Sequence, residues 1–187
     1  MKRLAVALAA LAALSACAPM PPVNFSVPNV TSSTRKLDAE LRSMTVTVAR
    51  PEEATGKIPA GIENKVPQLW QTALQESLNK KAIFRDDAPE KVNLSVKILK
   101  FEPLAFGMSM TTEVAARYEL QNRFNGDVIY SQNITSTGTV SADYAFAGAT
   151  RMVESANRAV QNNIALFLQA LETVDLNKPM ERTTASK

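Results

Sequence analysis

The sequence has 187 residues, with 21 Lys and Arg against 18 Asp and Glu, one Cys and no His. The missing His excludes histidine triads, histidine general bases and the usual zinc sites, and a single Cys forms neither an intrachain disulfide nor an iron–sulfur cluster. The formal charge of +3 includes Lys2 and Arg3, so the remainder is nearly neutral and predicts no nucleic-acid partner. No phosphate-binding glycine motif or distinctive carboxylate pair stands out, so we expect no cofactor, no metal and no enzymatic activity.

The first 17 residues have the organisation of a bacterial export signal. A basic start at residues 1–3 precedes an apolar run over residues 4–14. This run of about 11 residues is much shorter than the roughly 20 that a membrane-spanning helix needs. The run ends in Leu14-Ser15-Ala16-Cys17, which resembles the lipobox of bacterial lipoproteins. The resemblance implies cleavage before Cys17, a diacylglycerol on its thiol and a fatty acid such as palmitate on its new amine.

An ordinary secretory signal, cut after Ala16-Cys17-Ala18, is the alternative interpretation. Such a cut would place Pro19 directly after the scissile bond, where proline generally blocks ordinary signal peptidase. We therefore predict a lipoprotein signal peptide over residues 1–16 and a membrane anchor at Cys17. In lipoproteins of enteric type, Asp after the cysteine retains the protein at the inner membrane. Ala18 gives no such signal, so the resemblance implies an outer-membrane lipoprotein that faces the periplasm.

Residues 17–33 are predicted to be a lipidated tether. No residue from Ala18 to Ser33 is charged, and proline recurs among Ser, Thr and Asn. Proline stiffens such a segment and denies it a helix, so we expect an extended spacer that holds the domain away from the bilayer. We expect residues 34–177 to form one periplasmic domain and residues 178–187 to form a disordered polar tail.

Within the domain, hydrophobic periodicity predicts the elements in turn. Residues 44–50 alternate as a first strand, and residues 51–63 form a long loop rich in Pro and Gly. Residues 65–81 have an apolar stripe at helical spacing, with Trp70 as a core anchor. Asp86-Asp87 is expected in a solvated turn rather than as a catalytic pair.

The second half predicts a three-strand meander and a long helix. The strands cover residues 92–101, 108–124 and 128–140, and Asn125-Gly126 favours a tight turn between the last two. Residues 149–172 form the helix. Its outward polar face is expected to hold Arg151, Glu154, Asn157, Arg158, Gln161 and Asn162. The order β-α-β-β-β-α predicts an α+β two-layer sandwich, with a mostly antiparallel four-stranded sheet and both helices on one face.

A meander places the 102–107 and 141–148 connections at the same end of the sheet. Both are unusually apolar for loops, which are normally polar. We predict a candidate contact edge made of Leu104, Phe106, Tyr144 and Phe146. Two interpretations stay open: these side chains cap the open end of the core, or they form a contact surface for a partner or a lipid.

Short motifs also resemble those of YajG-type envelope lipoproteins of Gram-negative bacteria. They are Val92-Asn-Leu, Asn125-Gly126, Tyr144-Ala-Phe-Ala, Glu154-Ser-Ala-Asn and Asn163-Ile164. In architecture alone, the chain is similar to auxiliary lipoproteins of lipid-transport ABC systems and to the lipopolysaccharide-assembly lipoprotein. The resemblance implies a non-catalytic adaptor or accessory subunit with an envelope protein as partner. A lipid- or envelope-ligand-binding module is the alternative. The 102–107 segment departs from the YajG-type pattern, so no partner site is carried over there.

Overall fold

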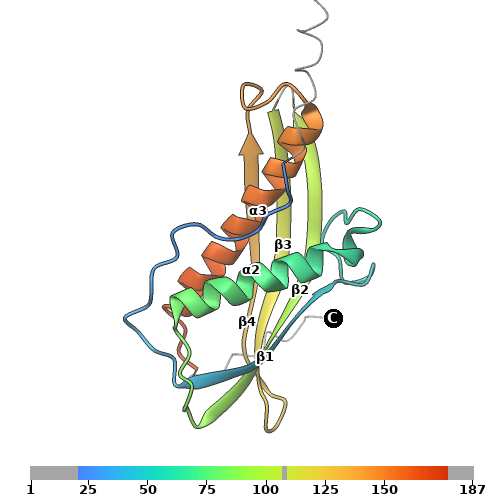
Figure 1. Cartoon of the computed structure of the whole chain (residues 1–187). Helices are drawn as coiled ribbons and strands as arrows, with labels where there is room; N and C mark the ends of the chain where they lie inside the picture. The colour runs from blue at the N-terminus through green and yellow to red at the C-terminus, as the bar shows by residue number, and fades with distance from the viewer. Residues whose placement is uncertain (1–20, 107–108, 177–187) are drawn as a thin grey trace, which may run out of the picture.

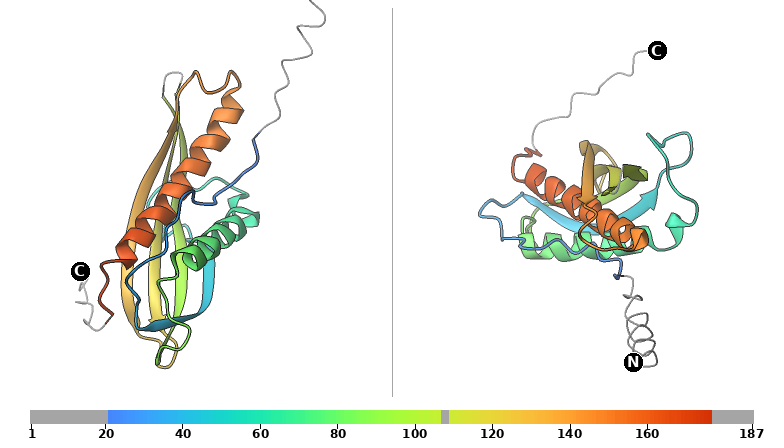
Figure 2. Two further views of the ribbon diagram at one scale, coloured as in Figure 1. Left: turned by 60° about the vertical axis from the view of Figure 1, so that its left-hand side comes forward. Right: turned by 90° about the horizontal axis from the view of Figure 1, so that it is seen from above.

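Four strands and two long helices make up most of the chain, in a computed structural model that describes residues 21–106 and 109–176. The strands form one sheet in the order β1-β2-β3-β4, and both helices pack on the same face of it (Figures 1 and 2). The predicted α+β two-layer fold is confirmed. The predicted signal peptide (1–16), Cys17 and the tail (178–187) lie outside the described residues. The elements are β1 (Ala39–Val48), the short 3-10 helix η2 (Ile62–Asn64), α2 (Val66–Lys81), β2 (Glu90–Phe106), β3 (Ser109–Asn122), β4 (Val128–Val140) and α3 (Gly148–Leu171).

The sheet is mixed, because α2 carries the chain from β1 to a parallel neighbour, β2, before the antiparallel meander β2-β3-β4. β1 begins five residues before the predicted start, at Ala39. A register shift between Leu41 and Ser43 interrupts the alternation of apolar and polar residues. The hydrophobic period therefore could not predict this part of the strand.

β2 continues to Phe106, so residues 102–106 are strand rather than the predicted loop. The pairing of β1 with β2 ends at Ile98, and beyond that point β2 is an edge strand. An edge position tolerates Pro103, which has no backbone N–H to donate to a neighbour.

The core lies between the sheet and the helices. Trp70 of α2 is fully buried, as predicted, and the ring of Phe25 meets it edge-on with ring centroids 6.4 Å apart. In the same core, Tyr118 of β3 stacks on Phe167 of α3 at 4.1 Å between centroids. Alternate residues of β2 and β3 complete this layer, namely Val92, Leu94, Val96, Ile98, Val114, Ala116 and Leu120.

α3 lies unusually close to β4 at Gly138. A Cβ atom at this position would be 2.3 Å from the carbonyl oxygen of Ser155 and 2.4 Å from the backbone nitrogen of Ala159. Next to it, the hydroxyl of Ser136 donates a hydrogen bond to the carbonyl oxygen of Ala159 at 2.8 Å. Glycine is therefore what allows the helix backbone to rest on the strand.

Residues 21–37, here called the N-terminal arm, cross α3 and then pass the C-terminal end of α2 (Figure 1). The arm has no helix, as its prolines predict, but its described part is not a free spacer. Phe25 and Val27 are buried in the core. The backbone N–H of Ser33 donates to the carbonyl oxygen of Lys81 at 2.7 Å. The backbone N–H of Leu37 donates to the carbonyl oxygen of Ile83 at 2.8 Å. Apolar side chains within a proline-rich segment thus fasten it to the domain.

The arm also changes the outer face of α3. Asn157, predicted to face solvent, is buried because the arm covers it. Its side-chain oxygen accepts a hydrogen bond from the Asn24 N–H at 2.9 Å, and its amide donates to the carbonyl oxygen of Pro22 at 3.2 Å. The predicted pair of Glu154 and Arg158 is present on the same helix, at 2.8 Å.

Candidate functional site

The connection between β4 and α3 lies at one end of the sheet (Figure 2). It contains two aromatic residues, Tyr144 and Phe146. Phe146 has a relative exposure of 103 %, and Tyr144 is about half exposed. Arg151, in the first turns of α3, donates from Nη1 to the carbonyl oxygens of Ala145 and Phe146, the latter at 3.0 Å. The guanidinium carbon of Arg158 lies 5.4 Å from the centre of the Tyr144 ring. Two arginines of α3 thus hold the loop while the Phe146 ring stays in solvent.

The other half of the predicted edge lies on the opposite face of the sheet. Leu104 pairs with Thr111 in β3, three residues beyond the core residue Phe101. Odd spacing along a strand reverses the side-chain direction, so Leu104 faces away from the helices. It is partly exposed and lines a shallow groove with Ile58 and Pro59. Phe106 ends β2, and its side chain is outside the described part of the chain.

The three predicted residues whose side chains are described, Leu104, Tyr144 and Phe146, therefore do not form one continuous edge. Tyr144 and Phe146 share a loop on the helix side, and Leu104 lies at the same end of the sheet on the other face. A fully exposed ring cannot cap a hydrophobic core, so the capping interpretation is wrong for Phe146. Tyr144 and Phe146 keep the geometry that a contact surface requires.

A further exposed aromatic residue lies at the opposite end of the sheet, in the hairpin between β3 and β4. Phe124 has a relative exposure of 99 %. The side-chain oxygen of Asn122 accepts hydrogen bonds from the N–H groups of Phe124 and Asn125, at 2.7 and 3.1 Å, and Gly126 adopts a positive φ of 79°. The sequence predicted this turn but not the exposed ring. A large apolar residue at the tip of a tight hairpin was the available signal.

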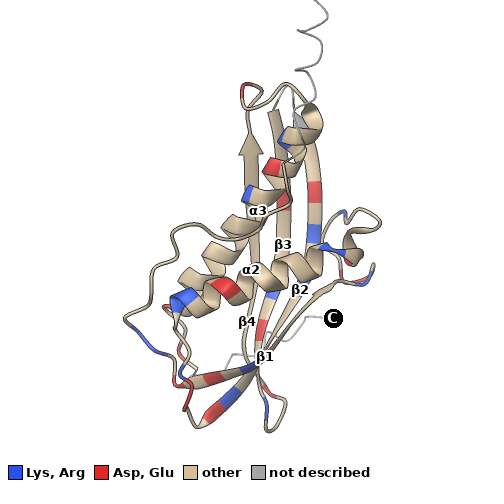
Figure 3. Cartoon of the chain, viewed as in Figure 1, with Lys and Arg blue, Asp and Glu red and all other residues tan. Residues whose placement is uncertain are grey.

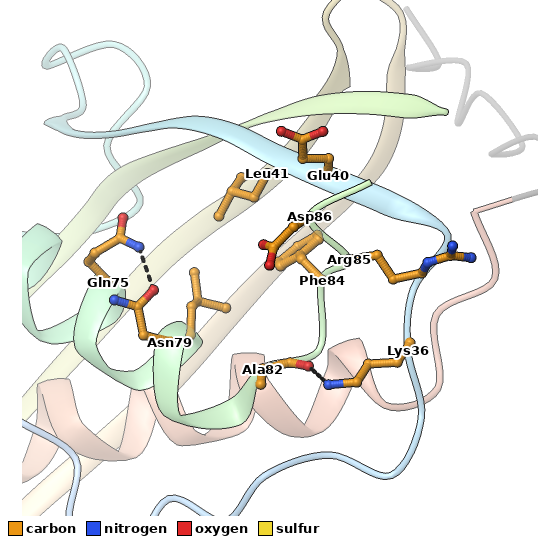
Figure 4. A pocket seen from close by; sticks show the side chains of 10 residues that line it. Lys36, Glu40, Leu41, Gln75, Asn79, Ala82, Phe84, Arg85 and Asp86 are labelled. Atoms are coloured by element: carbon orange, nitrogen blue, oxygen red, sulfur yellow. Dashed lines mark hydrogen bonds between the residues drawn. The ribbon is translucent and has the colours of Figure 1, made fainter. Parts of the chain in front are cut away.

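A groove lies between the end of α2, the start of β1 and the connection from α2 to β2 (Figure 4). Its volume is about 380 Å³. Asp86, from the predicted solvated turn, lines it with Lys36 and Glu40, while Asp87 forms an ion pair with Arg85 at 3.2 Å. The Lys36 ammonium donates to the carbonyl oxygen of Ala82. Charged and amide side chains around this groove suit a polar ligand rather than an acyl chain.

Lys and Arg are mixed with Asp and Glu on β1, β2, β3 and both helices, whereas β4 carries no charged residue (Figure 3). Among the described residues, no three His, Cys, Asp or Glu side chains come close enough to hold a metal ion. No helix in residues 21–106 and 109–176 combines the length and apolar character that crossing a membrane requires.

No family model matches the chain, and no curated protein matches it in sequence. The fold is similar to that of protein XCC0632 from Xanthomonas campestris, a DUF330 protein. That structure has 11 % identity and a TM-score of 0.53, and the match covers 79 % of this chain and 90 % of that one. A weaker likeness is to a minor lipoprotein from Acinetobacter baumannii, with 12 % identity, a TM-score of 0.42 and coverage of 72 % and 92 %. At these identities the first likeness shows a shared fold, and the resemblance to YajG-type lipoproteins stays a prediction.

Proposed function

We propose that the protein is a non-catalytic adaptor or accessory subunit of an envelope complex, anchored to the outer membrane through Cys17. The lipobox-like sequence Leu14-Ser15-Ala16-Cys17 supports the anchor. The N-terminal arm supports it further, because its hydrogen bonds to Asn157 and Lys81 transmit the position of the anchor to both helices. A domain fixed in this way is suited to hold a partner at a set place near the membrane.

The observation that carries the adaptor role is Phe124. Its ring is fully exposed on a hairpin that Asn122 and paired strands hold in one conformation. Aromatic residues that are rigidly presented serve as anchors in protein interfaces, because little conformational entropy is lost when they are buried. We infer that this hairpin inserts Phe124 into an apolar pocket of an envelope protein.

The test is a pull-down from detergent-solubilised envelope with the wild type and with Phe124→Ser. The wild type is expected to recover one stoichiometric protein, and Phe124→Ser is expected to lose it with an unchanged denaturant midpoint. Leu166→Ser is the matched control, because Leu166 is a partly exposed apolar residue of α3 and does not belong to the hairpin. Equal recovery by the wild type and Phe124→Ser would exclude Phe124 as the anchor.

The second candidate function is an envelope-ligand-binding module, for which the groove of Figure 4 is the favouring observation. Extraction of a small molecule without any stoichiometric protein would support it. Loss of that molecule in Lys36→Ala, with retention in Phe124→Ser, would place the ligand in the groove.

A further inference from the structure

We propose that the loop carrying Tyr144 and Phe146 rests on the lipid surface in which Cys17 is anchored, so that this end of the sheet faces the bilayer and the Phe124 hairpin points away. The inference rests on the lipid anchor of the proposed function. It adds an orientation and a second membrane contact, made by aromatic side chains rather than by acyl chains.

The first step is the place where the chain leaves the domain. Pro22 and Asn24 are both hydrogen-bonded to Asn157 of α3, at 3.2 and 2.9 Å. The side chain of Gln161 donates to the carbonyl oxygen of Asn24 at 3.0 Å. The arm is therefore fixed to α3 from Pro22 onward. Only residues between Cys17 and Pro22 can separate the anchor from the domain.

The second step is the reach of that short piece. Cys17 precedes Pro22 by five residues, which span at most about 17 Å when fully extended. Along α3, the distance from Asn157 back to the first residue, Gly148, is about 14 Å at about 1.5 Å per residue. The two lengths are similar. The bilayer surface thus lies within reach of the loop that precedes α3.

The third step excludes the other end of the sheet. β4 contains 13 residues between the Phe124 hairpin and the Phe146 loop, which corresponds to about 44 Å at about 3.4 Å per residue. A five-residue connection from Pro22 cannot place the bilayer at the hairpin. Of Phe124 and Phe146, the two phenylalanines that are fully exposed among the described side chains, Phe146 is the one that the anchor brings to the membrane.

The chemistry of the loop suits a lipid interface. Tyr144 combines an apolar ring with a hydroxyl, and aromatic residues of this kind concentrate where acyl chains meet headgroups. Phe146 supplies an apolar ring without a polar group. The carbonyl oxygens of Ala145 and Phe146 are already hydrogen-bonded to Arg151, so the loop does not bring these acceptors unpaired to an apolar surface.

The test must report position rather than affinity, because the acyl chains on Cys17 would dominate binding and mask one aromatic ring. Phe146→Trp and Phe124→Trp are expressed as full, lipidated chains. Both are reconstituted into phosphatidylethanolamine and phosphatidylglycerol vesicles whose acyl chains carry bromine, a contact quencher of indole fluorescence. Trp70 is fully buried in the domain and gives the same background in both variants.

The expected result is strong quenching of the added indole in Phe146→Trp and emission in Phe124→Trp equal to that in unbrominated vesicles. Quenching at both positions, at neither, or only in Phe124→Trp would overturn the orientation while the protein still floats with the vesicles. Loss of partner recovery in Phe146→Ser, without quenching in Phe146→Trp, would assign the loop to a protein and also overturn it. Palmitate labelling identifies the remaining case. If the chain is unlabelled and does not float with the vesicles, both the lipid anchor and the proposed orientation are wrong.

Discussion

At the scale of single residues, the buried side chain of Asn163 links α3 to the sheet through hydrogen bonds. The hydroxyl of Tyr118 donates to the side-chain oxygen of Asn163 at 2.9 Å, and the Asn163 amide donates to the carbonyl oxygen of Ile134 at 2.9 Å and to Ser136 at 3.0 Å. Burial raises the pKa of Tyr118 above its ordinary value, so the hydroxyl stays neutral and acts as a donor. Periodicity could not predict this role, because an asparagine within an apolar stripe gives no sign of its partner.

Replacing the buried Asn163 is expected to destabilise the fold. Asn163→Ala removes the partner of three polar groups that no water can reach easily, so the free energy of unfolding should fall by at least about 2 kcal/mol. Its neighbour Asn162 is exposed and donates to the carbonyl oxygen of Thr137 at 2.8 Å, so Asn162→Ala should cost under about 1 kcal/mol. Denaturant titration of both variants measures the difference. Similar losses would contradict the role of Asn163.

The close approach at Gly138 makes a second prediction. In Gly138→Ala, the new methyl group would overlap the backbone of α3 at Ser155 and Ala159, which no side-chain rotation can relieve. We expect a loss of about 1–3 kcal/mol or more in the free energy of unfolding. Gly148→Ala is the control, because its nearest neighbour would be the Met110 methyl group at an ordinary 3.5 Å. A Gly138→Ala protein as stable as Gly148→Ala would show that α3 can shift freely.

At the scale of elements, the periodic segments were predictable and the irregular ones were not. α2 and α3 lie within a residue of their predicted bounds because most positions of their inner stripes are apolar, and the Asn125-Gly126 turn fixes the start of β4, which matches its predicted bounds. The register shift in β1 and the edge position of Pro103 in β2 depend on pairing between strands, which one sequence does not show. For the same reason the prolines of the arm suggested a spacer, although Phe25 and Val27 fasten it to the core.

The arm should contribute to stability as a core element does. Phe25 is buried against Trp70, so Phe25→Ala is expected to lower the free energy of unfolding by about 3–5 kcal/mol. Val23, two residues earlier, is substantially exposed, and Val23→Ala should change it by less than about 0.5 kcal/mol. Thermal or denaturant unfolding distinguishes the two. A stable Phe25→Ala protein would return the arm to the role of a spacer.

Glu53 makes the loop after β1 sensitive to pH. Hydrogen bonds from Lys97, at 2.7 Å, and from Arg50 lower the pKa of Glu53 from 4.5 to about 2. Because the folded-state pKa is the lower one, this interaction stabilises the fold above pH 4.5 and is lost as pH falls from 4.5 towards 2. Glu53→Gln and Lys97→Met should both weaken the dependence of the free energy of unfolding on pH in this range. If the free energy of unfolding of Glu53→Gln changes with pH as steeply as that of the wild type, Glu53 is not the titrating group.

At the scale of the whole molecule, the sequence predicted the exposed contact residues at one end of the sheet and not at the other. The sequence predicted contact residues at one end, of which Tyr144 and Phe146 have the required exposure, and it missed Phe124 at the other. Exposure could not be inferred because an apolar side chain in a loop is equally compatible with burial under a neighbouring element. Partner identity is not written in the local pattern at all, since a hydrophobic anchor binds any pocket of matching shape.

The anchor itself is tested on the intact protein. Cys17→Ser should leave an unprocessed chain without fatty acid, because serine offers no thiol for the diacylglycerol. Wild-type protein should take up labelled palmitate and move with the outer membrane on a density gradient, whereas Cys17→Ser should show neither property. Label on the serine variant would contradict the lipoprotein assignment. Wild-type protein found only in the inner-membrane fraction would contradict the predicted location.

The arm also determines the order in which the molecule can be completed. Asn24 bonds to a residue 133 positions later in the chain, and Ser33 and Arg35 bond to Glu172, 139 and 137 positions later. A chain that emerges from its N-terminus presents Asn24 long before Asn157 of α3 exists to receive it. Contacts this distant in sequence form slowly and late. The arm therefore completes its contacts with α3 and Glu172 only after the rest of the domain has been made.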